Sequence, residues 1–255
     1  MVTRRGLVPS ALELLDRAGI LLWAQTPVYQ LREPQLADPA VRERAVGLVR
    51  DLVRRDRSHP SVLTWSLANE LPSRPGPGHA ATLEAMAAAA READPDRFLA
   101  VDILGHPGVE AQSTYRVVDA LGINAYFGWY NGPSGATADR SKLGGYLDDM
   151  RRLYPDHALF VTEFGAEANR EGPADEKGTY AFQTRLLRDV VTTIDDRPFV
   201  NGAITWLLRD FRVKPGWAGG NPKPTAPINA KGLVDDTGRR KPAFTELQRL
   251  FKRKP

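Results

Sequence analysis

The chain has 255 residues and no cysteine. Without thiols it can form no disulfide, hold no zinc through thiolates and use no cysteine nucleophile. Histidine is also scarce, and the four that are present lack the spacing of metal ligands. The sequence therefore predicts no metal site.

Long apolar runs are missing as well. No segment approaches the roughly 18 consecutive apolar residues of a transmembrane helix, and no secretory leader opens the chain. We therefore expect no membrane partner. The missing leader favours a cytoplasmic location, but the start of the chain is expected to be truncated, so the compartment stays undetermined.

The net charge of +4 comes from arginine-rich helices, and residues 50–57 resemble a nucleic-acid patch at first sight. Helical periodicity places these arginines opposite an apolar face made of Val41, Ala45, Leu48, Leu52 and Val53. This pattern is typical of a solvated surface helix. We therefore expect no nucleic-acid partner.

Short apolar runs alternate with amphipathic helical stretches along the whole chain. The expected strands cover residues 20–23, 62–67, 98–101, 117–123, 158–162 and 203–207. The expected helices cover residues 9–18, 40–57, 80–93, 142–153, 178–194 and 242–252. This alternation predicts an α/β fold with a parallel sheet covered by helices, as one domain over residues 1–255.

Two features favour a TIM (β/α)8-type barrel over an open doubly wound sheet. No glycine-rich phosphate loop follows any expected strand, so the dinucleotide-binding fingerprint is missing. Polar residues follow the strands directly, and in a barrel the C-terminal strand ends form the active-site face. These residues are Asn69, Glu70, Asn124, Glu163 and Asp210.

Two of these strand-end residues, Glu70 and Glu163, are glutamates. A lone glutamate at a strand end is more often part of a salt bridge on the barrel rim. Two strand-end glutamates that face the same mouth of a barrel can lie close together, although they are distant in sequence. Glycoside hydrolysis needs such a pair, because one carboxyl group protonates the leaving oxygen while the other attacks the anomeric carbon or activates water.

The segments around both glutamates resemble those of glycoside hydrolase family 2, which contains β-galactosidases, β-glucuronidases and β-mannosidases. Residues 57–70 (RSHPSVLTWSLANE) are similar to its acid/base segment, and residues 160–166 (FVTEFGA) to its nucleophile segment. Further segments resemble the family in the same order: 124–130 (NAYFGWY), 206–211 (WLLRDF), 229–234 (NAKGLV) and 240–243 (RKPA). The resemblance implies a retaining exo-β-glycosidase that acts on a carbohydrate substrate without a cofactor.

The resemblance also implies a role for individual residues. Glu163 is expected to be the nucleophile and Glu70 the acid/base. Tyr126 is expected to orient the Glu163 carboxylate, and Asn69 to bind the 2-hydroxyl of the sugar. Other substrate contacts are expected from Asn124, Tyr130, Trp206, Asn229 and Lys231. For Trp206, a stacking floor under the sugar and ordinary core packing are equal interpretations.

The identity of the sugar stays open between a β-glucuronide and a β-galactoside. Asn229 and Lys231 resemble a pair that grips the sugar carboxylate in β-glucuronidases, but galactosidases can share Asn-x-Lys-Gly. Two other interpretations remain: an endo-acting β-mannanase or cellulase on a related barrel, and a truncated fragment that binds sugar without turnover.

Six expected strands are too few for an eight-stranded barrel, because strand number, tilt and shear are linked. We therefore expect the chain to lack the first two strands of its barrel. The strands near Ile20 and Ala203 would then be open edges, which invite self-association. Low activity of the isolated chain is expected for the same reason.

Overall fold

The computed structural model describes residues 2–3 and 9–252, and these fall into two compact units. The first unit is Met1–Leu104, Val109–Ile123 and Leu153–Leu159. The second unit is Gly105–Gly108, Asn124–Arg152 and Phe160–Pro255. None of the helices in the described part of the chain is long and apolar enough to cross a membrane.

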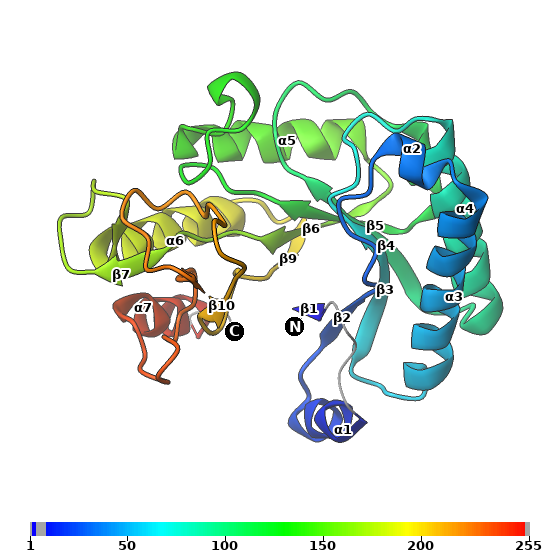
Figure 1. Cartoon of the computed structure of the whole chain (residues 1–255), viewed down its shortest axis with the longest axis horizontal. Coiled ribbons are helices and arrows are strands. Elements are labelled where there is room, and N and C mark those ends of the chain that lie inside the picture. Colours follow the sequence, from blue (N-terminus) through cyan, green and yellow to red (C-terminus); the bar gives the residue numbers. More distant parts are fainter. Residues whose placement is uncertain (1, 4–8, 253–255) are drawn as a thin grey trace. The chain divides into compact units, whose positions relative to one another are not determined.

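The first unit is a parallel sheet with helices packed on it (Figure 1). Its strands lie in the order β1-β2-β3-β4-β5, with β1 against β2, β2 against β3 and β3 against β4 in parallel. In chain order its elements are β1 Val2–Thr3, α1 Pro9–Ala18, β2 Leu22–Gln25, α2 Glu33–Leu36, α3 Pro39–Asp56, β3 Val62–Asn69, α4 Pro77–Ala93, β4 Phe98–Leu104, the 3-10 helix Ser113–Val117 and β5 Ala120–Asn124.

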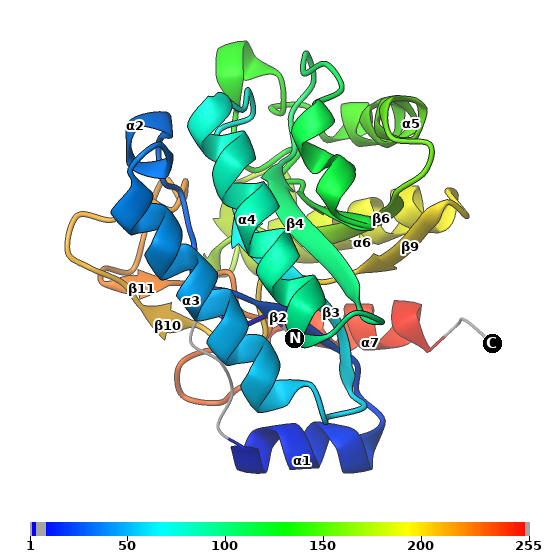
Figure 2. The ribbon, with the colours of Figure 1, turned by 90° about the vertical axis from the view of Figure 1, so that its right-hand side faces the viewer.

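Helices α3 and α4 lie side by side and pack on β3 (Figure 2). The inward face of α3 is Ala45, Val49, Leu52 and Val53, and its arginines are exposed or partly exposed. Leu48, which the periodicity placed on the apolar face, is 43% exposed, because the buried stripe passes through Val49 instead. Strand β3, which connects the two helices in the chain, is buried almost throughout, and this explains its nearly continuous apolar sequence.

Strand β1 was not expected from the sequence. Val2 pairs with Trp23 and Thr3 with Ala24, so β2 has a partner on each side. The prediction that the strand near Ile20 would be an open edge is therefore wrong. A strand of two residues has no alternation of side chains, so periodicity could not indicate it.

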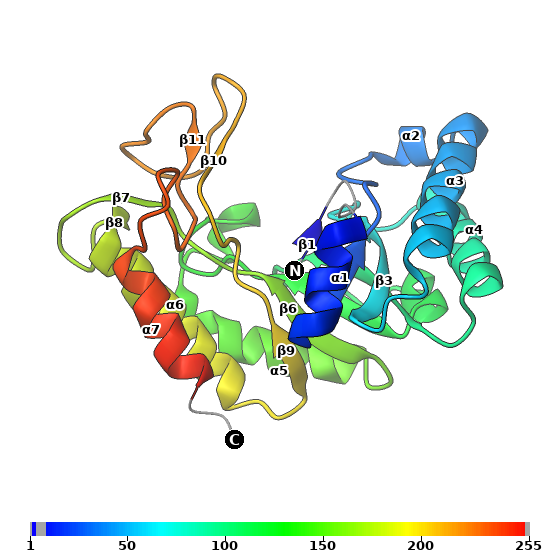
Figure 3. The same cartoon turned by 90° about the horizontal axis from the view of Figure 1, so that it is seen from below.

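The second unit is built around β6, which begins in the first unit and continues into the second. Helices α6 and α7 pack side by side within it (Figure 3). Its elements are the 3-10 helices Pro133–Gly135 and Arg140–Lys142, α5 Leu143–Leu153, β6 Ala158–Glu163, β7 Ala168–Arg170, β8 Gly178–Thr179, α6 Tyr180–Asp195, β9 Val200–Ala203, β10 Phe211–Arg212, β11 Ile228–Asn229 and α7 Pro242–Phe251.

The sequence placed the strand near Trp206 too late. The regular strand is β9, Val200–Ala203, whereas residues 203–207 were expected. The chain after β9 still bonds to neighbouring backbone, since Ile204 N donates to Val161 O and Trp206 N to Phe164 O. The regular strand ends at Ala203, and the peptide bond between Trp206 and Leu207 is cis. The other predicted strands and all six predicted helices are confirmed with small shifts at their ends.

Candidate active site

In the first unit, Glu70 stands directly after β3 in an uncommon backbone conformation. Its φ is +52°, in the left-handed region that side chains larger than glycine seldom adopt. Its N–H donates to Asp102 O at 2.9 Å. Gln30 is also left-handed, with φ of +49°, and its Nε2 donates to Glu70 Oε2 at 2.7 Å. The two described non-glycine residues of this unit with left-handed backbone are thus bonded to each other.

Beneath this turn, Asp102 joins three strands through one carboxylate. It is 1% exposed and accepts hydrogen bonds from Trp23 Nε1 at 3.1 Å, from Ser66 Oγ at 2.6 Å and from Gln25 Nε2. Donors of this kind stabilise the charged form of a buried carboxylate. Asn69, at the end of β3, is buried and pairs with Asp102 in the strand register. The end of β3 is therefore held rigidly.

In the second unit, Glu163 is the last residue of β6 and is 5% exposed. The hydroxyl of Tyr126 donates to Glu163 Oε2 at 2.7 Å. Asn124 lies at the end of β5, and its Oδ1 accepts from Thr162 Oγ1 at 3.0 Å. Ala125 N donates to Glu163 O at 2.7 Å, which continues the pairing of the two chain segments up to the glutamate.

Lys231 is enclosed by aromatic side chains in the same unit. Its side chain is 2% exposed, and Nζ donates to Tyr130 Oη at 2.8 Å and to Gly219 O at 3.3 Å. The same nitrogen lies 5.0–6.0 Å from the ring centroids of Tyr126, Trp129, Tyr130 and Trp217. Burial lowers the pKa of Lys231 to about 8, although Glu167 and Glu163 oppose the shift.

Glu167 is the carboxylate nearest to this ammonium. It is fully buried, and its Oε1 lies 3.8 Å from Lys231 Nζ. Burial raises the pKa of Glu167, and Lys231 lowers it. Asn229 turns towards its own segment, where its Oδ1 accepts from Lys231 N at 3.1 Å.

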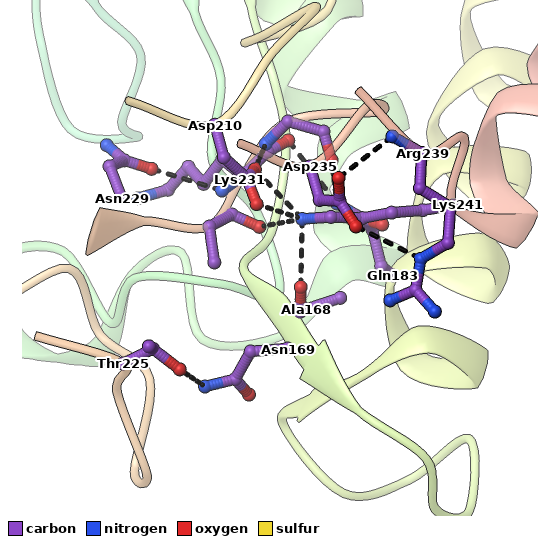
Figure 4. Close-up of polar contacts among 12 residues, drawn as sticks. Ala168, Asn169, Gln183, Asp210, Thr225, Asn229, Lys231, Asp235, Arg239 and Lys241 are labelled. Atoms are coloured by element: carbon purple, nitrogen blue, oxygen red, sulfur yellow. Dashed lines mark hydrogen bonds and ion pairs between the residues drawn. The ribbon is translucent and has the colours of Figure 1, made fainter. Parts of the chain in front are cut away.

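A second buried lysine, Lys241, anchors the segment that contains Lys231 (Figure 4). Its Nζ donates to Asp210 Oδ1 at 2.9 Å, to Ala168 O at 2.9 Å and to Ala230 O at 2.8 Å. Asp210 in turn accepts from Gly232 N at 2.7 Å. The residues on both sides of Lys231 are therefore fixed by one buried ion pair.

Trp206 is half-buried, unlike Trp129, which is 1% exposed. The Trp206 ring meets Phe211 edge to face, with centroids 6.5 Å apart. Beneath it, Gly165 approaches closely, since a Cβ at this position would lie 2.2 Å from Trp206 O. Trp129 belongs to the core, whereas Trp206 is partly exposed.

The structure places the predicted residues in two groups. Asn69 and Glu70 belong to the first unit. The other seven belong to the second unit: Asn124, Tyr126, Tyr130, Glu163, Trp206, Asn229 and Lys231. Within the described residues, no group of three or more histidine, aspartate or glutamate side chains could hold a metal ion.

Sequence reasoning missed Gln30, Asp102 and Glu167. Glu167 had a usable signal, because it is a single charge in the otherwise apolar and small run Phe164–Ala168 and is therefore expected to be buried. Gln30 had none, since its partner Glu70 is distant in sequence.

Comparisons with known proteins identify the family and the fold. Residues 8–250 match the family model described as glycosyl hydrolases family 2, TIM barrel domain. The chain is 27% identical over 226 residues to a β-glucuronidase of Paenibacillus borealis, covering 80% of this chain and 36% of that protein. It is 26% identical over 249 residues to the human β-glucuronidase, covering 94% of this chain and 36% of that protein. The chain thus spans about a third of the length of these curated relatives.

Solved structures show the same fold. The β-glucuronidase of Bifidobacterium dentium, complexed with coumarin-3-O-glucuronide, has a TM-score of 0.83 and 25% identity over 99% of this chain and 40% of that one. A family 2 β-galacturonidase of Eisenbergiella tayi, bound to galacturonate, has a TM-score of 0.85 and 21% identity over 100% of this chain and 44% of that one. At such identity, the second likeness concerns the fold alone.

Proposed function

Because this chain belongs to glycosyl hydrolase family 2 and has the fold of its TIM barrel domain, we propose that it hydrolyses terminal β-linked sugars with retention of configuration. Glu163 is the proposed nucleophile and Glu70 the proposed acid/base. The observation that best supports this assignment is the hydrogen bond from Tyr126 Oη to the buried Glu163 carboxylate. A phenol that donates to a carboxylate favours its ionised form, and an ionised carboxylate is what a nucleophile requires.

The reaction would proceed by double displacement. Glu163 attacks the anomeric carbon, and the bond to the leaving oxygen breaks as Glu70 gives it a proton. Glu70 then takes a proton from water, which attacks the anomeric carbon and releases Glu163. The left-handed turn and the bond from Gln30 would fix the direction of the Glu70 carboxylate.

A β-glucuronide is the proposed substrate. Lys231 and Tyr130 offer an ammonium and a hydroxyl that are already bonded to each other, and the ammonium is largely excluded from water. A sugar carboxylate would gain more from this ammonium than from an exposed one, because the local dielectric is low. The relatives named above as β-glucuronidases support the same substrate class.

The test of the nucleophile is covalent trapping. A 2-fluoro glucuronide with a good leaving group should label the purified protein once, on the peptide that contains Glu163. Glu163→Gln should abolish the label, and Glu176→Gln, a matched change of a partly exposed glutamate, should leave it. A label on Glu70 or Glu167 in the unchanged protein would contradict the assignment.

The test of the acid/base uses azide. Glu70→Ala should lose less activity on a glucuronide whose leaving group needs no protonation than on one whose leaving group needs it, and added azide should restore turnover and give a β-glucuronosyl azide. Glu163→Ala should give the α-anomer, because azide then enters from the nucleophile's face. The same anomer from both variants would show that the roles are wrong.

A further inference from the structure

Glu167 faces the same ammonium that the proposed substrate would use. Its carboxylate is fully buried, and among the described residues Lys231 is the cation within ion-pair distance of it. The enclosure is tight, because a Cβ at Gly219 would lie 1.8 Å from Glu167 Oε1. The close packing around Glu167 and Lys231 therefore leaves both side chains little room to move.

The other charged groups near the pair are already engaged. Lys241 uses its three N–H groups on Asp210, Ala168 O and Ala230 O. Glu163 accepts from Tyr126. Asn221, Tyr126 and Tyr130 are further polar neighbours of the pair, and they are neutral. Among the described residues, Lys231 is thus the one cation within ion-pair distance of Glu167.

An acidic sugar would bring a second carboxylate to one buried ammonium. Two carboxylates that share a site do not both stay ionised, since the like charges repel and burial penalises each of them. Glu167 is the one that is fully buried, and burial already raises its pKa. It is therefore the group that becomes neutral.

We propose that Glu167 is the internal counterion of Lys231 and takes up one proton from solvent when an acidic sugar binds. Glu167 is thus a positioning residue that holds the ammonium in place until the sugar carboxylate replaces it as the ionised partner. This role rests on the proposed function, because it assumes that the sugar carboxylate reaches Lys231.

Proton uptake makes affinity depend on pH. Where Glu167 is ionised in the free protein and protonated in the complex, the dissociation constant for glucuronate rises tenfold per pH unit. With Glu167→Gln the dissociation constant should be constant over the same range, up to the pH at which Lys231 itself loses its proton. That pH should be below 8 in the variant, because Glu167 raises the pKa of Lys231.

The experiment is calorimetric titration of D-glucuronate into the full chain at pH 6.5, in buffers that differ in ionisation enthalpy. At this pH Lys231, with a pKa of about 8, is already protonated and contributes little. We expect proton uptake on binding to the unchanged protein, approaching one per glucuronate where free Glu167 is ionised, and close to none with Glu167→Gln. Glu167→Asp should restore the uptake, and the matched variant Glu176→Gln should not change it.

Binding of glucuronate with equal proton uptake in the unchanged protein and in Glu167→Gln would overturn the role of Glu167 and leave the proposed substrate standing. Failure of glucuronate to bind better than glucose would overturn the acidic-sugar site and this proposal together. If Glu167→Gln does not fold, Glu167→Asp and the tenfold slope of affinity against pH in the unchanged protein decide the question.

Discussion

Lys231 and Lys241 are two buried ammonium groups of the same unit, and they have different surroundings. Both side chains are 2% exposed. Lys241 donates to three oxygens at 2.8–2.9 Å, one of which belongs to the carboxylate of Asp210. Lys231 has two oxygen acceptors, four aromatic rings within 6.0 Å and a carboxylate at 3.8 Å.

The difference separates an ammonium that holds the fold from one that is suited to bind a ligand. A buried charge is tolerated when its hydrogen-bonding capacity is filled at short distance, as at Lys241. Aromatic rings stabilise a cation without saturating it, so Lys231 keeps capacity for another acceptor. Burial lowers the pKa of both lysines, which shows that burial alone does not distinguish them.

The comparison of the two lysines predicts that the largest effect, a loss of stability, follows from replacement of Lys241. Lys241→Met leaves Asp210 buried without its cation and Ala168 O without its side-chain donor, so the free energy of unfolding should fall by about 3–5 kcal/mol. Urea unfolding measures this loss. Lys223→Met, at a lysine that is 70% exposed, should change it by less than about 1 kcal/mol. Equal losses of unfolding free energy in Lys241→Met and Lys223→Met would show that Lys241 does not hold the fold in the way proposed.

Lys231→Met should act on substrate selection. Loss of a charge-assisted hydrogen bond to the sugar carboxylate costs roughly 1.5–3 kcal/mol, so kcat/KM for a glucuronide should fall about 10–150-fold. Turnover of the matching neutral glucoside should change little. Stability should fall less than in Lys241→Met, because Glu167 can take a proton when its cation is gone. Equal losses on both substrates would indicate a structural role.

The pH dependence of glucuronide binding should show the titration of Lys231. Its pKa is lowered to about 8, so the ammonium is charged below that pH and loses its charge above it. The dissociation constant for glucuronate should therefore rise by an additional tenfold per pH unit above about pH 8. A neutral glucoside should show no such break. Lys231→Arg, which stays protonated, should also lose the break.

The smallest effect is expected at Tyr130. Tyr130→Phe removes the hydroxyl that accepts from Lys231 Nζ and keeps the ring beside it. A single hydrogen bond contributes roughly 0.5–1.5 kcal/mol, so kcat/KM for a glucuronide should fall about two- to tenfold. Steady-state kinetics on both substrates measure the change, and a fall as large as that of Lys231→Met would mean that Tyr130 contacts the sugar itself.

The sequence predicted the helices and strands, because each of these depends on a local pattern of residues. Helical periodicity found the helices, and apolar runs found the strands that lead to Glu70 and Glu163. The contacts that shape the site join distant segments, such as Gln30 with Glu70 and Lys241 with Ala168. No spacing rule encodes them, because each depends on how strands and loops come together.

The two lysines illustrate the same limit. Asn-x-Lys-Gly indicated a binding residue at Lys231, and the run around Glu167 could indicate its burial, but no pattern indicated that the two side chains face each other. Lys241 and its partner Asp210 each belonged to a segment with a family resemblance, but neither segment indicated that the two side chains pair. Which buried charges form an ion pair depends on the three-dimensional fold, so the sequence alone did not predict these pairs.

The left-handed backbone at Gln30 and Glu70 has a consequence for engineering this protein towards heat resistance. Glycine or asparagine adopts that conformation at lower cost than glutamine or glutamate. A screen for thermal tolerance alone would therefore favour replacements at both positions. Each replacement would remove the proposed acid/base or the side chain bonded to it. At Gln30 and Glu70, thermal stability and catalytic turnover therefore make opposite demands, so variants selected there need an activity screen beside the thermal one.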